Sequence, residues 1–264
     1  MQNGRVDRTS SASSEVFKVG FKGFTGSIGG GGGSGSLFNK AMLQCHFDGI
    51  NGSTTFTDAA MAQTLTKTGS PTISTAQSKF GSSSCNFTGS TDKLTIANSI
   101  HNKWFPIDTF QIDFWIFTTQ TGIQDTLLIE RIQTSSFNIN SDWMVSFNTS
   151  STTNGHLSFW HININNAAPV LTSTSAINDG AWHHVAISGV GLWRGLFIDG
   201  VLQDHRAITS GYIPTTNTQD ITIGNTKVFS TRAFIGYLDE LRIVMGGVDY
   251  TRDFTPPTGA YADS

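Results

Sequence analysis

The alternation of apolar and polar side chains over residues 109–117 constrains the fold of this chain more than any other feature. The segment reads Thr-Phe-Gln-Ile-Asp-Phe-Trp-Ile-Phe, which places apolar residues on one side (Phe110, Ile112, Phe114, Ile116) and Asp113 and Trp115 on the other. Successive side chains of a β-strand point to opposite faces, so a period of two predicts a strand with one buried face.

The same pattern recurs in short segments separated by turn residues. Strands are expected over residues 41–47, 83–87, 93–96, 126–131, 143–147, 157–162, 182–188, 193–198, 220–223 and 237–244. Segments 83–87 and 93–96 flank a Thr-Gly-Ser-Thr-Asp turn and are expected to form a hairpin, and Asp199-Gly200 is a dipeptide that favours tight turns. The predicted fold is all-β, an antiparallel two-sheet β-sandwich (jelly roll).

Composition agrees with this prediction and excludes several partners. Charged residues make up 13% of the chain, about half the usual share of roughly 25%, so few surface helices are expected. The net charge of −3 lacks the basic excess that nucleic-acid binding requires. No apolar run approaches the ~20 residues of a membrane span. Residues 1–20 contain no apolar core of a secretory signal, so release by another route, such as lysis, is expected.

Residues 1–36 differ from the rest of the chain. After a polar start, glycine recurs at every third position from Gly20 to Gly29, and a Gly/Ser run then extends to Ser36. This period is the requirement of the collagen triple helix, although three triplets without proline cannot hold one alone. The Gly/Ser run is typical of a flexible linker. The pattern predicts an extended Gly-rich anchoring arm over 1–36 before a folded domain over 37–264; a disordered tail is the alternative.

Cys45 and Cys85 are the only cysteines of the chain. Two cysteines are too few for a disulfide framework, and their spacing does not fit a metal site. Both alternate with apolar residues on expected strands, so we expect two buried, small apolar side chains. A disulfide between them is the alternative.

Three blocks of sequence carry a family resemblance. They are Leu43-Gln-Cys-His-Phe-Asp-Gly-Ile-Asn-Gly-Ser-Thr-Thr-Phe-Thr-Asp58; Ala181-Trp-His-His-Val-Ala-Ile187 with Leu196-Phe-Ile-Asp-Gly-Val-Leu202; and Ile235-Gly-Tyr-Leu-Asp-Glu-Leu-Arg-Ile243 with Tyr250-Thr-Arg-Asp-Phe254. Together they resemble the laminin-G-like, concanavalin A-like jelly-roll domain of many secreted, adhesive and viral proteins. The resemblance covers about residues 40–261 and implies the same sandwich.

The resemblance also implies a calcium site. Such jelly rolls often hold a structural calcium ion between a carboxylate on the first strand and another near the last, and Asp48 and Asp239 occupy positions that look equivalent. Calcium takes about six to eight oxygen ligands, so backbone carbonyls and water would complete the shell. The alternative is that Asp48 caps a turn and Asp239 accepts hydrogen bonds from loop backbone.

A second resemblance concerns the arm. The run Gly23-Phe-Thr-Gly-Ser27 is similar to collagen-like segments in structural proteins of tailed bacteriophages, where they often precede a laminin-G-like head. It implies a virion structural or adhesion protein: a tail fibre, an appendage component or a head decoration protein. Residues 1–36 would bind other virion proteins, the head would bind a host-surface glycan or neighbouring subunits, and a homo-oligomer, with a trimer favoured, is expected. The alternative is a carbohydrate-binding or adhesion module of a secreted bacterial protein.

Glycoside hydrolases share this jelly roll, so catalysis has to be considered. Retaining enzymes need two carboxylates about 5–5.5 Å apart. The chain has three glutamates, Glu15, Glu130 and Glu240, and no Glu-x-Asp-x-x-Glu arrangement. Asp239 and Glu240 are adjacent and should face opposite ways on a strand. We therefore expect a protein that is not an enzyme, and a glycosidase is the remote alternative.

Tryptophan and histidine side chains supply the remaining site candidates. Four tryptophans near expected strand ends or loops could stack on a sugar, with core packing as the alternative for each: Trp104, Trp143, Trp160 and Trp193. Trp115 and Trp182 are expected in the core or on a sheet face. The neighbours His183 and His184 should point to opposite faces, one packed and one solvated, and so cannot chelate one metal together.

Overall fold

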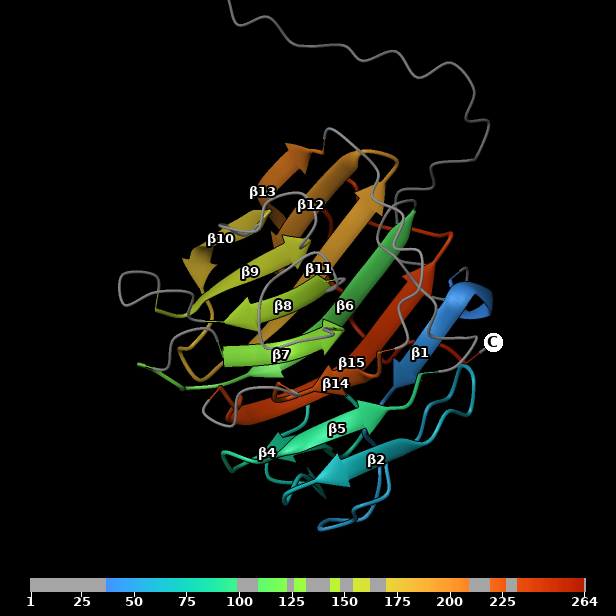
Figure 1. Ribbon diagram of the computed structural model, residues 1–264, viewed down its shortest axis with the longest axis vertical. Coiled ribbons are helices and arrows are strands. Elements are labelled where there is room, and N and C mark those ends of the chain that lie inside the picture. Colours follow the sequence, from blue (N-terminus) through green and yellow to red (C-terminus); the bar gives the residue numbers. More distant parts are fainter. Residues whose placement is uncertain are drawn as a thin grey trace, which may run out of the picture. The chain divides into compact units, whose positions relative to one another are not determined.

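The computed structural model describes residues 37–98, 109–122, 126–131, 143–147, 154–161, 170–208, 219–226 and 232–263. These residues form two antiparallel β-sheets that stack face to face (Figure 1). The predicted all-β, two-sheet sandwich is therefore confirmed. The arm predicted over residues 1–36 and the side chain of Trp104 lie outside the described residues. The described part of the chain has no helix with the length and apolar character that a membrane span needs.

Sheet A has eight strands. Its main path runs in the order β13 (Val201–Ala207), β12 (Trp193–Ile198), β11 (Trp182–Val190), β6 (Phe110–Phe117), β15 (Gly236–Met245), β4 (Ser84–Phe87) and β3 (Thr72–Ser74). A short 3-10 helix, η2 (Phe38–Lys40), leads into β1 (Ala41–Cys45), which also pairs with β15. β15 is long enough to pair with β4 near its start and with β1 near its end.

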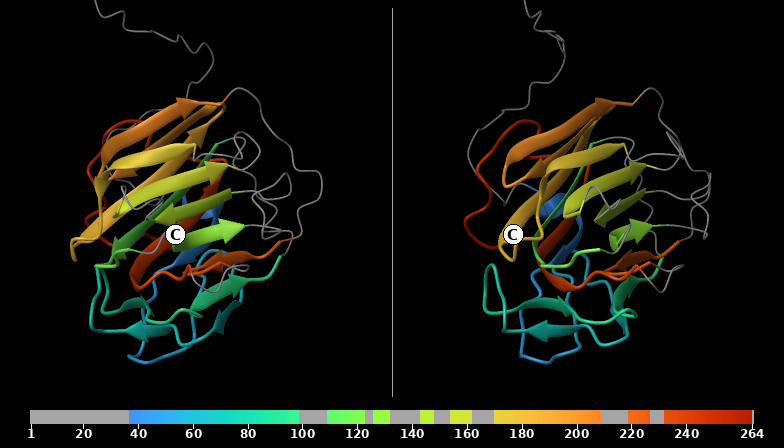
Figure 2. Two further views of the ribbon diagram at one scale, coloured as in Figure 1. Left: turned by 60° about the vertical axis from the view of Figure 1, so that its left-hand side comes forward. Right: turned by 90° about the vertical axis from the view of Figure 1, so that its left-hand side faces the viewer.

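Sheet B has seven strands. Their order is β10 (Leu171–Ala176), β9 (His156–His161), β8 (Trp143–Phe147), β7 (Thr126–Arg131), β14 (Ile221–Ile223), β5 (Lys93–Ile96) and β2 (Leu65–Thr68). Figure 2 shows the two sheets from the side, one stacked on the other. The segments of β2, β3 and β10 were not predicted as strands, because β2 and β10 each end in three exposed residues and β3 has only three residues.

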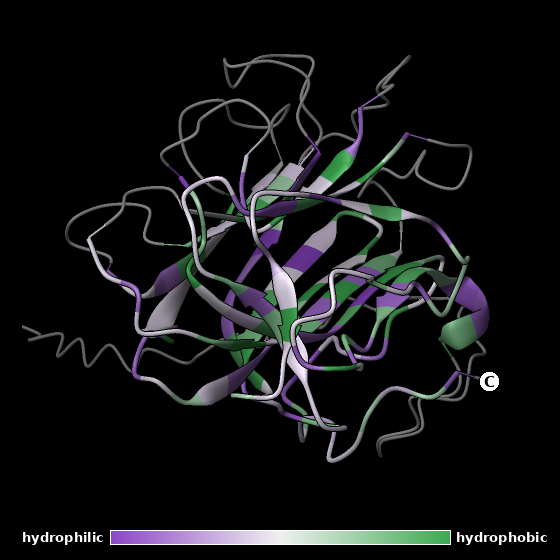
Figure 3. Ribbon diagram, turned by 90° about the horizontal axis from the view of Figure 1, so that it is seen from below, coloured by the Kyte–Doolittle hydropathy of each residue, from purple (hydrophilic) through white to green (hydrophobic). Residues whose placement is uncertain are grey.

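One apolar core fills the space between the sheets. In sheet A it takes every second residue of β6 (Phe110, Ile112, Phe114, Ile116), and in sheet B it takes Trp143, Val145 and Phe147 of β8. Apolar and polar residues accordingly alternate along the strands in Figure 3. The predicted faces of residues 109–117 are confirmed, with Asp113 and Trp115 on the side away from the core.

Cys45 and Cys85 both lie in this core as free thiols. Each is fully buried, and burial raises the pKa of both thiols well above the usual value. The prediction of two small buried apolar side chains is confirmed.

The predicted hairpin between residues 83–87 and 93–96 is wrong. β4 pairs with β3 and β15 in sheet A, whereas β5 pairs with β2 and β14 in sheet B. The turn between them is held by the buried carboxylate of Asp92, which accepts hydrogen bonds from the backbone N–H groups of Thr88 (2.8 Å), Gly89 (2.9 Å) and Ser70 (2.7 Å). These bonds favour a turn that passes from one sheet to the other.

Candidate functional site

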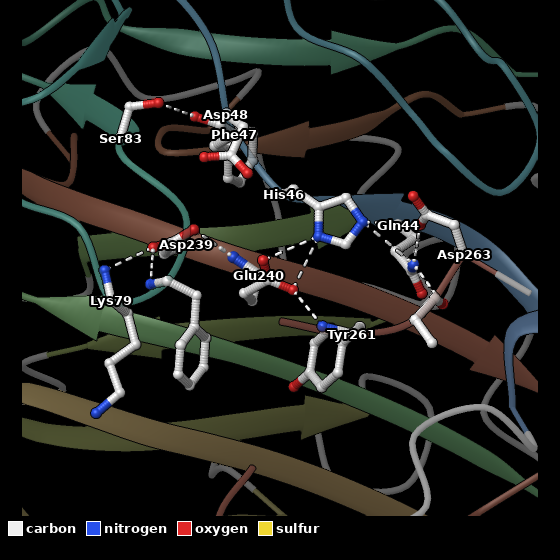
Figure 4. Close-up of polar contacts among 12 residues, drawn as sticks. Gln44, His46, Phe47, Asp48, Lys79, Ser83, Asp239, Glu240, Tyr261 and Asp263 are labelled. Atoms are coloured by element: carbon white, nitrogen blue, oxygen red, sulfur yellow. Dashed lines mark hydrogen bonds and ion pairs between the residues drawn. The ribbon is translucent and has the colours of Figure 1, made fainter. Parts of the chain in front are cut away.

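The calcium site predicted from the sequence lies where β1 ends beside β15 (Figure 4). Two residues here have left-handed backbone: Phe47, with φ 57°, follows β1, and Glu240, with φ 49°, lies within β15. The pairing of β15 with β6 shifts register between Asp239 and Arg242, as at a β-bulge. Because of this irregularity, Asp239 and Glu240 both direct their carboxylates to contacts on the side away from the core. The expectation that they face opposite ways is wrong.

Asp48 and Asp239 hold the loop over residues 79–83 from two sides. The Oδ2 atom of Asp239 accepts hydrogen bonds from the backbone N–H groups of Lys79 (2.7 Å) and Phe80 (3.2 Å). The Oδ1 atom of Asp48 accepts one from Ser82 (3.1 Å). Burial raises the pKa of Asp239 to about 7 in spite of these bonds.

These carboxylates fit a calcium site only in part. Each already accepts hydrogen bonds from loop backbone, which is the alternative that the sequence left open. Within the described residues, no group of three or more His, Cys, Asp or Glu side chains is placed to hold a metal ion. Two carboxylates supply a minority of the six to eight oxygens that calcium takes. Calcium binding by Asp48 and Asp239 therefore stays a prediction.

His46 lies between two carboxylates at the same place. Its Nδ1 atom is 2.9 Å from Oε1 of Glu240, and its Nε2 atom is 2.8 Å from Oδ1 of Asp263. The hydrogen bond to Glu240 raises the pKa of His46 to about 9, so the ring is protonated at neutral pH. A protonated ring that donates from both nitrogens has no lone pair for base catalysis. This cluster instead ties the C-terminal segment to the end of β1.

The C-terminal segment, residues 246–263, covers part of the outer face of sheet A. Beneath it, Arg242 and Asp113 form a fully buried ion pair with 2.8 Å between Nη2 and Oδ2. Tyr261 donates its hydroxyl to Oδ2 of Asp113 (2.9 Å) and its backbone N–H to Oε2 of Glu240 (2.8 Å). These polar groups hold the segment in place and are not open to a ligand.

His183 and His184 point to opposite faces, as predicted. His184 is buried on the outer face of sheet A, with Nε2 3.2 Å from the hydroxyl of Tyr261, and burial lowers its pKa to about 4. His183 is partly exposed, with Nδ1 2.7 Å from Asp199 and Nε2 3.0 Å from Asp179. The hydrogen bond to Asp199 raises the pKa of His183. Neither ring is placed with the other for metal binding.

The candidate tryptophans have different surroundings. Trp143 is fully buried in the core, so the expectation of an exposed ring is wrong there, since alternation along β8 turns it toward sheet A. Trp160 is partly exposed on the outer face of sheet B. Trp193 is partly exposed and packs against Phe197, with 6.4 Å between ring centroids. Sugar binding by Trp160 and Trp193 stays a prediction.

The sequence patterns did not predict a row of aromatic side chains that lies on the outer face of sheet A. Trp182 of β11, Phe117 of β6 and Tyr237 of β15 are opposite one another in strand register, and each is partly exposed. The ring centroids are 5.7 Å apart between Trp182 and Phe117 and 5.9 Å apart between Phe117 and Tyr237. We call these three side chains the aromatic row. Alternation with the core residues Ile116 and Leu238 could have placed Phe117 and Tyr237 on the outer face, but not beside each other.

Several solved structures have a similar fold at low sequence identity. The binding domain of botulinum neurotoxin serotype D matches with a TM-score of 0.59 and 14% identity over 79% of this chain and 49% of that chain. The binding domain of Paraclostridial Mosquitocidal Protein 1 matches with a TM-score of 0.56 and 17% identity over 83% and 50%. This chain thus spans about half the length of those binding domains.

A third structure is similar over nearly its whole length. Domain 4 of AbnA, an extracellular arabinanase of family GH43 from Geobacillus stearothermophilus, solved in complex with arabinotriose, matches with a TM-score of 0.55 and 15% identity over 78% of this chain and 93% of that domain. At these identities the likeness concerns the fold.

Family comparison extends this likeness to the sequence. No curated protein matched the chain. Residues 88–246, more than half of the chain, match the family model described as the Concanavalin A-like lectin/glucanases superfamily. This span runs from the end of β4 to the end of β15 and includes all three members of the aromatic row. The chain therefore belongs to the Concanavalin A-like lectin/glucanases superfamily.

Proposed function

We propose that the jelly-roll domain is a non-enzymatic glycan-binding module, of the carbohydrate-binding or adhesion kind. The aromatic row is the observation that carries this proposal. Aromatic rings stack on the apolar C–H faces of sugars, and adjacent large apolar side chains at a surface mark a site of interaction. Trp182, Phe117 and Tyr237 supply three such rings on one sheet face.

The carboxylates of the same face argue against catalysis. Asp113 is paired with Arg242, Asp239 binds loop amides, and Glu240 binds His46 and the amide of Tyr261. A retaining glycosidase needs one carboxyl free to attack and another free to donate a proton. Carboxylates committed to structural contacts do not meet that requirement.

Similar folds give further support. Domain 4 of the arabinanase was solved with arabinotriose, and the neurotoxin and mosquitocidal structures are binding domains. Use of this fold for binding, as part of larger proteins, agrees with the proposal.

The experiment is a glycan array probed with the wild-type protein and two variants. We expect Trp182→Ala to lose the wild-type signals and Leu192→Ala to keep them, because Leu192 is exposed in the turn between β11 and β12, outside the aromatic row. Thermal unfolding of each variant checks that it is folded. The proposal is overturned if the wild type binds no glycan, or if Trp182→Ala binds as the wild type does.

A second candidate function rests on the arm. The glycine period of residues 20–29 favours a virion protein whose residues 1–36 anchor it to other virion proteins and whose domain projects as part of a homo-oligomer, with a trimer favoured. Quantitative mass spectrometry of purified virus particles tests this candidate. We expect a fixed copy number per particle, in a multiple of three; absence of the chain from particles would exclude it.

A further inference from the structure

The strand register that aligns the aromatic row extends to two further strands, so the aligned positions cross five strands of sheet A. Tyr237 is opposite Asn86 of β4, and Asn86 is opposite Thr72 of β3. Asn86 and Thr72 are partly exposed, and each alternates with a core residue, so both lie on the outer face. With strands about 4.8 Å apart, a row across five strands measures about 19 Å. The surface is therefore long and narrow, with rings at one end and an amide and a hydroxyl at the other.

The rings of the row are strongly inclined to one another. The planes of Trp182 and Phe117 meet at 56°, and those of Phe117 and Tyr237 meet at 77°. A flat crystalline polysaccharide offers coplanar sugar faces, so it could not lie against all three rings at once. A single chain can turn about its glycosidic bonds and present a differently inclined face to each ring.

The positions bordering the row carry little charge. On one side, two residues along each strand, lie Gly180, Thr119, Ile235, Thr88 and Ser70, none of which is ionisable. On the other side the corresponding positions are His184, Trp115, Asp239, Ser84 and Ser74, all buried. Lys79 adds one ammonium group there, 3.9 Å from the ring centroid of Trp115. One ammonium does not match the repeated charge of a polyanion, so the surroundings fit a neutral ligand.

From these observations we infer that the site binds a single, soluble chain of neutral sugars that runs across the strands of sheet A, from Trp182 toward Thr72. This inference rests on the proposed glycan-binding function and adds the class and direction of the ligand. The apolar sugar faces stack on the three rings. Beyond them, the hydroxyl groups of the chain exchange hydrogen bonds with the Asn86 amide and the Thr72 hydroxyl. Longer chains gain contacts that short ones cannot reach.

The test compares ligand length in two variants by isothermal titration calorimetry. The probes are arabino- and cello-oligosaccharides of three and of six units. We expect Trp182→Ala to weaken binding of both lengths by about tenfold. Asn86→Ala should weaken binding of the six-unit probe and leave that of the three-unit probe unchanged. Leu192→Ala, which removes an exposed apolar side chain in the turn between β11 and β12, outside the site, serves as the control and should bind as the wild type does.

Microcrystalline cellulose and heparin test the class of ligand. We expect weak retention on cellulose and no saturable binding of heparin at 0.15 M salt, a concentration that screens isolated surface charges over about 8 Å. Preference for either polymer over the soluble neutral probes, with dependence on Trp182, would overturn this inference and leave the proposed function standing. An equal effect of Asn86→Ala on both lengths would overturn the direction of the chain. Failure of every glycan probe would overturn both proposals.

Discussion

Asp113 is the residue whose removal should destabilise the domain most clearly. It has no exposed surface and accepts hydrogen bonds from Nε (3.2 Å) and Nη2 (2.8 Å) of Arg242, the Tyr261 hydroxyl (2.9 Å) and the Gln111 amide (2.9 Å). In Asp113→Ala, the Arg242 guanidinium loses the anion that offsets its burial. Breaking one side of a buried ion pair costs about 3–5 kcal/mol. Stripping an acceptor from buried neutral donors adds about 1–3 kcal/mol.

The carboxylate of Asp249 should offset part of this loss of stability. Oδ2 of Asp249 is 3.6 Å from Nη2 of Arg242 and can move closer. Burial raises the pKa of Asp249 to about 6, and loss of the Asp113 charge removes one of the interactions that raise it. We therefore expect Asp113→Ala to lower the free energy of unfolding by about 4 kcal/mol at pH 7.

Urea unfolding followed by tryptophan fluorescence measures this loss, provided that the slope against urea is unchanged. The matched control is the double variant Asp113→Leu with Arg242→Met, which replaces both charges by apolar groups and should recover most of the stability. A loss below about 1 kcal/mol for Asp113→Ala, or a double variant as unstable as the sum of the singles, would refute the reasoning.

Three further predictions concern the protonation of His46, the backbone conformation at Gly200 and the binding of calcium. The pKa of His46 is about 9 in the fold and 6.5 outside it, so the charged ring stabilises the fold fully below about pH 6.5 and loses this effect as the pH rises toward 9. The difference in unfolding temperature between wild type and His46→Ala should therefore be largest near pH 6 and small near pH 10; a difference independent of pH would contradict this. Gly200 has φ 80°, and a Cβ there would overlap the carbonyl oxygen of Phe254, whereas Gly191, with φ 54°, has open space around it. Gly200→Ala should thus lose about 2 kcal/mol more in urea unfolding than Gly191→Ala, and equal losses would disprove the overlap. Because Asp48 and Asp239 supply only part of a calcium shell, we expect calcium to raise the unfolding temperature of chelator-treated protein at about millimolar rather than micromolar concentration, and not at all in Asp48→Asn. No shift at any concentration in the wild type would end the calcium hypothesis.

Local features of the fold could be read from the sequence because they depend on neighbouring residues alone. The alternation over 109–117 placed Phe110, Ile112, Phe114 and Ile116 in the core, since a strand turns successive side chains to opposite faces. Asp199-Gly200 likewise predicted a tight turn, and both residues have positive φ, 50° and 80°. The opposite orientations of His183 and His184 follow from the same geometry.

Contacts between distant segments could not be read in this way. Which sheet receives β4 and which receives β5 depends on the partners of both strands, and the bulge at Glu240 depends on the pairing of β15 with three others. Side-chain hydrogen bonds join Gln44 to Asp263 and Asp113 to Tyr261, across more than a hundred residues. In the aromatic row, Phe117 is 65 positions from Trp182 and 120 positions from Tyr237 along the chain.

The sequence by itself therefore determined most of the strands and their buried faces, because side-chain alternation and turn chemistry act over a few residues, and its three blocks of family resemblance indicated the fold. Only the tertiary structure decided which exposed side chains meet. Three aromatic residues from separate strands become one binding surface only when β11, β6 and β15 pair in the observed register, and that register is set by the shared core of both sheets rather than by any one segment.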